Sequence, residues 1–407
     1  MEALQDAKTH HRSICVSFLD LENAYGSVRH NLLQFAMSWY HFPKLVCERI
    51  FNYYERQVAR VCTDEWNSDW FQLGIGVYQG CTGSTGLFTI AFNLILDDVM
   101  RPETQEFGYQ VPGASAPTLL TGYADDIAII TKRTNYNQAI INRIVRRLDW
   151  TGSMRAKPVK CRSLAFKQVS ENGQYRYKAT DPKLEIRGEV FKCITDEPFK
   201  FLGTLLDQSL TNQIARARTL ARLKELFALV DSRQLRGTQK LWIYNYYIAT
   251  KLSWLIMVHD FPISFVRELD AIATASLKKW SGLAHSANVD ILFAKRSNKG
   301  LQLKNLQTYF KQMQLVRYHL LKHSHDTHVR EIYERASRRE PSQKLVWQPV
   351  HTLEHIEMKL QRDIEANEQA QRHAGLGWEP ATPVRLPTPA ERRKAINVFV
   401  SETAETE

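Results

Sequence analysis

The segment that most constrains the fold is TLLTGYADDIAIIT (118–131), in which two apolar runs flank the adjacent acids Asp125 and Asp126. Short apolar runs joined by a tight polar turn predict a β-hairpin. Strands this apolar belong in a core, so the turn holds two carboxylates beside buried surface. Because partly desolvated like charges repel each other, the pair needs a cation between or beside its carboxylates.

A second apolar run, SICVSFLD (13–20), is rich in β-branched and aromatic residues and stops at Asp20, as a buried strand that ends at a site would. Hard carboxylate ligands suit Mg²⁺, with Mn²⁺ as an alternative, and two such ions support phosphoryl displacement in polymerases and nucleases. An Asp-Asp pair in a turn is more often simply exposed to solvent and binds no metal, and for the pair taken alone that interpretation would prevail. The apolar strands on both sides of the pair count against it.

Composition narrows the class of partner. The 407-residue chain is 44% hydrophobic, so it can bury a substantial core. Its net charge of +11 favours a polyanionic partner such as nucleic acid. Its polar start and charge-broken apolar stretches predict an intracellular, soluble protein without a membrane span. The six cysteines form no CxxC pair, so they support neither a disulfide framework nor a zinc knuckle.

The first half of the chain mixes predicted helices and strands, whereas long amphipathic helices begin near Thr211. Helices are expected at 32–39, 43–54, from 87 and at 136–151, and strand-like runs occur at RQVARVCT and DWFQLGIGV. Within residues 208–300, 14 Lys or Arg stand against 6 Asp or Glu, so this helical part is the expected polyanion-facing surface. The Pro-rich and acidic end predicts disorder after about residue 380.

Five motifs in one order resemble the non-LTR retrotransposon (LINE-type) reverse transcriptases over about residues 13–300. The motifs are SFLDLENAYGSVRH, GVYQGCTGSTGLF, GYADDIAII, WTGSMRAKPVKC and FKFLGTLLD. The resemblance implies an α+β fold: a reverse-transcriptase palm, built from an antiparallel sheet with packed helices, followed by an all-helical thumb and a helical extension. The implied domains are a palm at 1–207, a thumb at 208–300, an extension at 301–379 and a disordered tail at 380–407.

By that resemblance Asp20 and Asp125 would be the principal ligands of two Mg²⁺ ions, and Asp126 would complete the triad and tune its charge. Tyr25 would lie against the sugar of the incoming nucleotide, where an aromatic ring clashes with a 2′-hydroxyl and selects deoxynucleotides, with an ordinary core aromatic as the less favoured alternative. Lys160 resembles the cation near the leaving pyrophosphate, with Lys157 as a rival; a solvated surface lysine is an equal alternative for either.

Two further segments complete the expected site. Gln79 and Gly80 resemble the segment that lines the nucleotide pocket, where a glycine lets the backbone approach the substrate. Phe201, Leu202 and Gly203 resemble the hairpin that grips the primer end, with an ordinary strand turn as the alternative. Thr82 and Thr85 depart from the family, since these positions are often proline.

The resemblance implies an RNA-directed DNA polymerase whose partners are an RNA template, a DNA primer and deoxynucleoside triphosphates. Members of the family also have a fingers region and an endonuclease domain, whereas only about a dozen residues precede the first motif here. We therefore expect a palm and thumb from a longer polyprotein. The protein would be nuclear if the parent element is mobile. The alternative is a catalytically inactive nucleic-acid-binding remnant of such a polymerase. An RNA-dependent RNA polymerase is disfavoured by Tyr25.

Overall fold

A computed structural model describes residues 2–78, 80–171, 174–296 and 300–338 and the individual residues 354, 355, 358 and 362. The chain divides into two compact units. The first extends to Leu202 and includes Leu206–Leu210, and the second comprises Gly203–Leu205 and the described residues from Thr211 onward. The predicted domain borders stay predictions, and the tail predicted from residue 380 lies outside the described residues.

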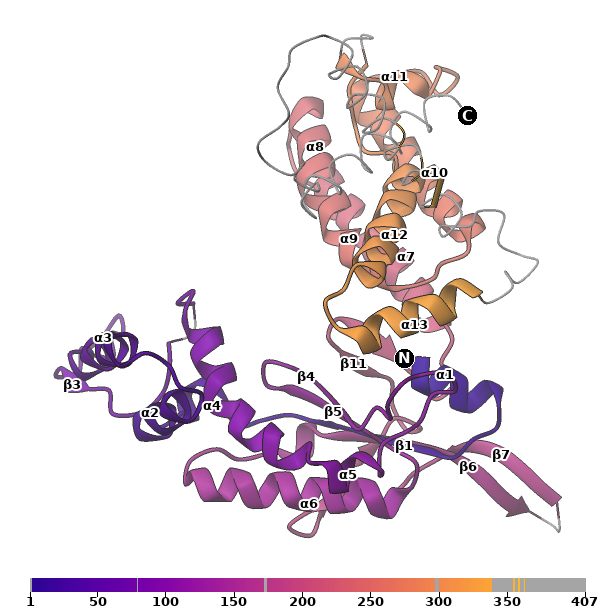
Figure 1. Ribbon diagram of the computed structural model, residues 1–407. Helices are drawn as coiled ribbons and strands as arrows, with labels where there is room; N and C mark the ends of the chain where they lie inside the picture. The colour runs from indigo at the N-terminus through magenta and orange to yellow at the C-terminus, as the bar shows by residue number, and fades with distance from the viewer. Residues whose placement is uncertain are drawn as a thin grey trace, which may run out of the picture. The chain divides into compact units, whose positions relative to one another are not determined.

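The first unit is a mixed helix and sheet structure (Figure 1). Its helices are α1 (Glu2–Thr9), α2 (His30–Trp39), α3 (Lys44–Glu55), α4 (Ser84–Val99), α5 (Pro102–Gln105) and α6 (Thr134–Thr151), with short 3₁₀ turns η1 (Tyr25–Ser27) and η2 (Pro158–Lys160). Its longer strands are β1 (Ile14–Leu19), β4 (Leu120–Tyr123), β5 (Asp126–Thr131), β6 (Arg162–Glu171) and β7 (Gln174–Thr180). Its shorter strands are β2 (Val58–Ala59), β3 (Phe71–Gln72), β8 (Glu185–Ile186), β9 (Glu189–Val190), β10 (Lys192–Cys193) and β11 (Phe199–Phe201), which pairs with β12 (Thr204–Leu206).

The central sheet has six strands in the order β10-β6-β1-β5-β4, and β7 pairs with β6. All of its pairings are antiparallel except that of β10 with β6. Strand β1 therefore lies between β5 and β6, which explains why its residues are buried along the whole strand. A central strand buried on both faces reads as a continuous apolar run, and this is the pattern that predicted it.

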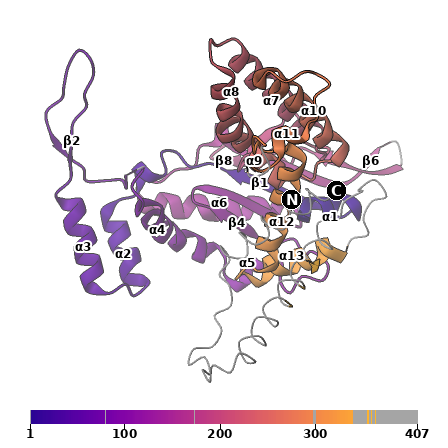
Figure 2. The same cartoon turned by 90° about the horizontal axis from the view of Figure 1, so that it is seen from above.

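Alternating side chains of β1 serve two different cores. Cys15 and Leu19 pack with apolar residues of α2, α4 and α6, whereas Ile14, Val16 and Phe18 pack with α1 and with the β11–β12 hairpin. Helix α6 overlaps β1 and β4 when the unit is viewed from above, as expected for a helix that runs along one face of the sheet (Figure 2). The predicted α+β fold with an antiparallel sheet and packed helices is confirmed.

Three local expectations need correction. The runs RQVARVCT and DWFQLGIGV contribute only two residues each to strands, β2 and β3, because neither run has a buried face. The polar start forms a helix, α1, which the sequence did not predict; three apolar side chains and Asp6 are buried there. The predicted helix through Leu241 to Leu255 exists, but a π-helical turn (η3, Tyr244–Ile248) interrupts it.

The second unit is helical, as expected from the periodicity after Thr211. Its helices are α7 (Gln213–Asp231), α8 (Gly237–Ile243), α9 (Ala249–Val258), α10 (Ile263–Ser281), α11 (Asp290–Phe293), α12 (Leu306–Lys322) and α13 (Thr327–Arg338). Asp231 links two of them: its carboxylate accepts hydrogen bonds from the Trp280 indole at 2.6 Å and from Lys279 at 3.0 Å. No helix within the described ranges is long and apolar enough to cross a membrane.

Candidate active site

The register of β1 against β5 brings Asp20 to the acidic hairpin. The last pair of that ladder joins Leu19 to Ile127, so the next antiparallel step sets Asp20 opposite Asp126. Opposite residues of an antiparallel pair have Cα atoms about 4.5–5.5 Å apart. Asp125 immediately precedes Asp126 at the tip of the β4–β5 hairpin, so segments more than a hundred residues apart in sequence place three carboxylates at one end of the sheet.

Strand alternation also assigns these acids to a face. Phe18 and Ala128 belong to the core on the side of the sheet opposite α4 and α6. With a period of two, Asp20 and Asp126 follow them on that side. Phe201 packs on Phe18, with ring centroids 4.7 Å apart. The predicted primer hairpin is therefore anchored two residues before Asp20, on the face where the acids lie.

The acidic turn carries local backbone strain. Tyr123 pairs with Asp126, which leaves Ala124 and Asp125 as a two-residue loop. Ala124 has a φ of 54° and Asp125 is not among the residues with positive φ, the pattern of a type II′ turn, which normally has glycine at the first position. Strained residues of this kind cluster at functional sites, which agrees with the predicted role of the turn.

Electrostatic interactions link the three carboxylates. Burial raises the pKa of Asp126, and the negative charges of Asp125 and Asp20 raise it further. Oxygen Oδ2 of Asp20 is buried and accepts no hydrogen bond, although the Lys160 ammonium lies 3.5 Å from it. An anionic oxygen without a hydrogen-bond donor, beside two more acids, is suited to a hard cation.

A complete protein ligand set is not assembled in advance. Within the described ranges, no three His, Cys, Asp or Glu side chains are arranged to hold one metal ion. Divalent ions in phosphoryl-transfer sites are commonly held by one or two carboxylates while water and substrate phosphates fill the other positions, and the Asp20 oxygen that accepts no hydrogen bond is a donor of this type. The residues present therefore fit such an ion, and the individual ligand roles of Asp20, Asp125 and Asp126 stay predictions.

Tyr25 and the second motif lie side by side. The Val77 amide donates to the Tyr25 carbonyl at 2.8 Å, and the Tyr25 ring stacks on Phe88 of α4 with centroids 4.8 Å apart. The Tyr25 hydroxyl donates to Oγ1 of Thr85 at 3.4 Å, a contact that the proline common at this position could not accept. Gly80 is exposed and has a φ of 93°, which favours glycine, whereas Gln79 lies outside the described residues.

The predicted primer hairpin is a two-residue turn between β11 and β12. Leu202 and Gly203 both have positive φ, 46° and 80°, as a type I′ turn requires. Within the second unit, a Cβ atom at Gly203 would collide with the indole of Trp254, so both the backbone conformation and the available space demand glycine. The tight turn is present, and its contact with a primer stays a prediction.

Asn137 was missed by sequence reasoning, because a polar residue in α6 gives no periodic signal. Its buried amide donates to the carbonyls of Cys15 at 3.1 Å and Ile129 at 3.3 Å, and its oxygen accepts from the Ser17 hydroxyl at 2.6 Å. It therefore joins α6 to β1, which ends just before Asp20, and to β5, which begins at Asp126. A buried polar network that is fully paired in this way fixes the relative position of its elements.

Asn137→Leu should lower the free energy of unfolding by about 2–4 kcal/mol, because it leaves the Ser17 hydroxyl and the strand carbonyls buried without their partner. Urea denaturation of the full chain measures this. Asn135→Leu, an exposed position on the same helix, should change stability by less than about 0.5 kcal/mol. Equal stability of the two variants would show that the Asn137 network contributes nothing to holding the strands.

The sequence model of the reverse transcriptase (RNA-dependent DNA polymerase) family matches residues 1–206, just over half of the 407-residue chain. The chain belongs to this family. Its similarity to retrotransposon enzymes is also confirmed: the retrovirus-related Pol polyprotein from type-2 retrotransposable element R2DM of Drosophila melanogaster is 22% identical to it over 328 residues. The match covers 80% of this chain and 30% of that protein, so the chain spans less than a third of the relative's length.

Among solved structures, the chain is similar to two telomerases. Apo telomerase from Candida tropicalis matches 82% of this chain and 54% of its own, with 13% identity and a TM-score of 0.39. Telomerase from Candida albicans in complex with a TWJ fragment of telomeric RNA matches 84% of this chain and 54% of its own, with 14% identity and a TM-score of 0.32.

Proposed function

We propose that this chain is an RNA-directed DNA polymerase region of a retrotransposon polyprotein, and that it adds deoxynucleotides to a DNA primer on an RNA template. The observation that carries this proposal is the β1–β5 register, which sets Asp20 opposite Asp126 and beside Asp125. Family membership supplies the reaction class. The Phe201 hairpin packs on the same face of the sheet as the acids, and this supports a primer end that would lie next to the carboxylates.

Each predicted site residue would have its own role in nucleotide addition. Asp20 and Asp125 would hold Mg²⁺, and Asp126 would add the charge that keeps the site negative. When bound, such ions stabilise the attacking and leaving oxygens of a phosphoryl transfer. Leu202 and Gly203 would bring backbone close to the primer end. Gly80, with Gln79 beside it in sequence, would line the nucleotide pocket next to Tyr25.

Tyr25 would exclude ribonucleotides with its ring. Tyr25→Ala should lower the preference for deoxynucleotides over ribonucleotides by roughly ten- to a hundredfold. A change of this size is typical when one steric contact in a binding pocket is lost. Primer extension with each nucleotide type, compared as kcat/KM, measures the preference. Tyr25→Phe keeps the ring and loses only the hydrogen bond to Thr85, so it should discriminate like the wild type. Unchanged discrimination in Tyr25→Ala would remove the steric role.

The test of the function is extension of a DNA primer on an RNA template by the full chain, with Mg²⁺ or Mn²⁺ and deoxynucleotides, at low and high salt. We expect extension that requires the divalent ion and weakens as salt rises, because phosphate contacts are salt-sensitive. Binding of template and primer without any extension, also when a fingers region is grafted to the chain, would instead establish the inactive nucleic-acid-binding remnant.

A further inference from the structure

Lys160 forms an ion pair with a predicted metal ligand, Asp20. Its Nζ lies 3.5 Å from Oδ2 of Asp20, the carboxylate oxygen that accepts no hydrogen bond. The two residues are 140 positions apart in sequence, so the contact results from the fold and not from local geometry. In the described structure, this ammonium group neutralises part of the charge that a divalent ion would otherwise neutralise.

The backbone around Lys160 is fixed beside Asp20. The Lys157 amide donates to the Asp20 carbonyl at 2.8 Å, and the Glu22 amide donates to the Arg155 carbonyl at 2.8 Å. Leu21 forms an antiparallel bridge with Ala156. These contacts join the segment that follows β1 to the segment that precedes η2. The main chain therefore places Lys160 next to the Asp20 carboxylate.

The contact itself is easily broken. The Lys160 side chain is 59% exposed and the Asp20 side chain 30% exposed. Ion pairs this open to solvent contribute little, and a divalent cation interacts with a carboxylate more strongly than an ammonium group does. A divalent ion on the Asp20 carboxylate would place a second positive charge close to the Lys160 ammonium, and the repulsion between the two cations favours departure of the ammonium.

We propose that Lys160 is a built-in counter-ion of Asp20, which it leaves when a divalent cation binds there. This inference rests on the proposed function, because it concerns the same carboxylates. It makes the role of Lys160 conditional: the ammonium group is held on Asp20 in the metal-free protein and becomes available to a phosphate group only in the metal-bound protein. Lys160 thus acts first as the counter-ion of Asp20, and it can contact substrate only after a metal ion has replaced it there.

The experiment measures Mn²⁺ binding to the full chain by the electron paramagnetic resonance signal of free Mn²⁺, without nucleotide or nucleic acid. Asp20→Asn identifies which binding depends on Asp20. Lys160→Met keeps the aliphatic stem and removes the charge, so we expect Asp20-dependent binding to tighten about three- to fivefold; fivefold corresponds to about 1 kcal/mol at 1.4 kcal/mol per tenfold. Lys157→Met loses the same charge three residues away and keeps its backbone donor, so it should change affinity less than twofold.

The outcomes separate the two proposals. An Asp20-dependent site that Lys160→Met leaves unchanged or weakens would overturn the counter-ion role while leaving the metal site intact. Equal tightening by Lys157→Met and Lys160→Met would also overturn it, because the effect would then be general charge. If no variant has an Asp20-dependent Mn²⁺ site, the proposed function is contradicted as well. Circular dichroism spectra of each variant confirm that the fold is retained.

Discussion

Asp20→Asn and Asp125→Asn should each reduce the rate of primer extension by about 10³-fold or more. Each change removes one anionic ligand oxygen from the site, and the loss of several kcal/mol of transition-state stabilisation corresponds to three orders of magnitude in rate. The rate is measured in single turnovers with saturating deoxynucleotide. Asparagine keeps the size of the side chain, so the strand ends and the hairpin should fold as before.

The control for lost charge is Asp64→Asn, an exposed acid in the loop between β2 and β3. It should extend primers at the wild-type rate. Asp126→Asn should fall between the two, because Asp126 tunes the charge of the site rather than acting as a principal ligand. Retention of more than a tenth of the wild-type rate by Asp125→Asn would rule out the proposed ligand role of that residue.

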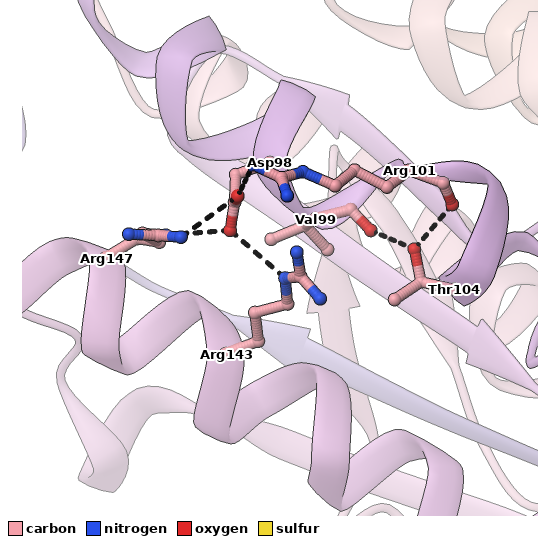
Figure 3. Close-up of polar contacts among 6 residues, drawn as sticks. All are labelled: Asp98, Val99, Arg101, Thr104, Arg143 and Arg147. Atoms are coloured by element: carbon pink, nitrogen blue, oxygen red, sulfur yellow. Dashed lines mark hydrogen bonds and ion pairs between the residues drawn. The ribbon is translucent and has the colours of Figure 1, made fainter.

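Asp98→Asn should be the most destabilising of the charge changes. Asp98 is 8% exposed at the end of α4, and its carboxylate pairs with Arg147 at 2.7 Å, Arg143 at 3.0 Å and Arg101 at 2.5 Å (Figure 3). The hydrogen bond from Arg147, followed by the contacts with Arg143, lowers the pKa of Asp98 to about 2. Without the carboxylate, three guanidinium groups face one another beside the α4–α6 contact.

The sign of the pH dependence follows from that lowered pKa. The folded value lies below the ordinary value of 3.8, so the stabilisation is present above about pH 4 and is lost as the pH falls towards 2. The shift corresponds to about 2 kcal/mol, after allowance for the partly exposed arginines. Urea denaturation, together with hydrogen exchange of the α4 and α6 amides, measures the difference in the free energy of unfolding between wild type and Asp98→Asn. This difference should be about 2 kcal/mol at pH 7 and smaller at pH 3. Asp97→Asn, the exposed neighbour, is the control, and a difference that stays constant with pH would contradict the ion-pair origin.

The central strands and the acidic hairpin could be predicted because their residues carry the signal themselves. β1 is apolar except for Ser17 and stops just before Asp20, and β4 and β5 flank a turn with two adjacent acids between apolar runs. The helices α2 and α4 show apolar residues at helical spacing. What these elements share is that burial on one or both faces dictates which amino acids they contain.

Pairwise polar contacts could not be predicted, because they join residues without a local pattern. Ser17 and Asn137 are 120 residues apart, and Asp98 and Arg147 are 49 apart. Helix α1 could not be predicted because its apolar face is short. The π-helical turn η3 could not be predicted because the one extra residue of a π-turn barely changes the spacing of the buried side chains. The contact of Lys160 with Asp20 belongs to the same class: the motif predicts a lysine near the site, and only the fold tells which oxygen it contacts.

The most direct measurement is a crystal structure of the chain grown with Mn²⁺, in which anomalous scattering locates the ions. We expect an ion bound by carboxylate oxygens of both Asp20 and Asp125, with the Lys160 ammonium displaced from Asp20. Carboxylates of Asp20 and Asp125 more than about 10 Å apart, too far to share the metals of one two-ion centre, would contradict the active site described above.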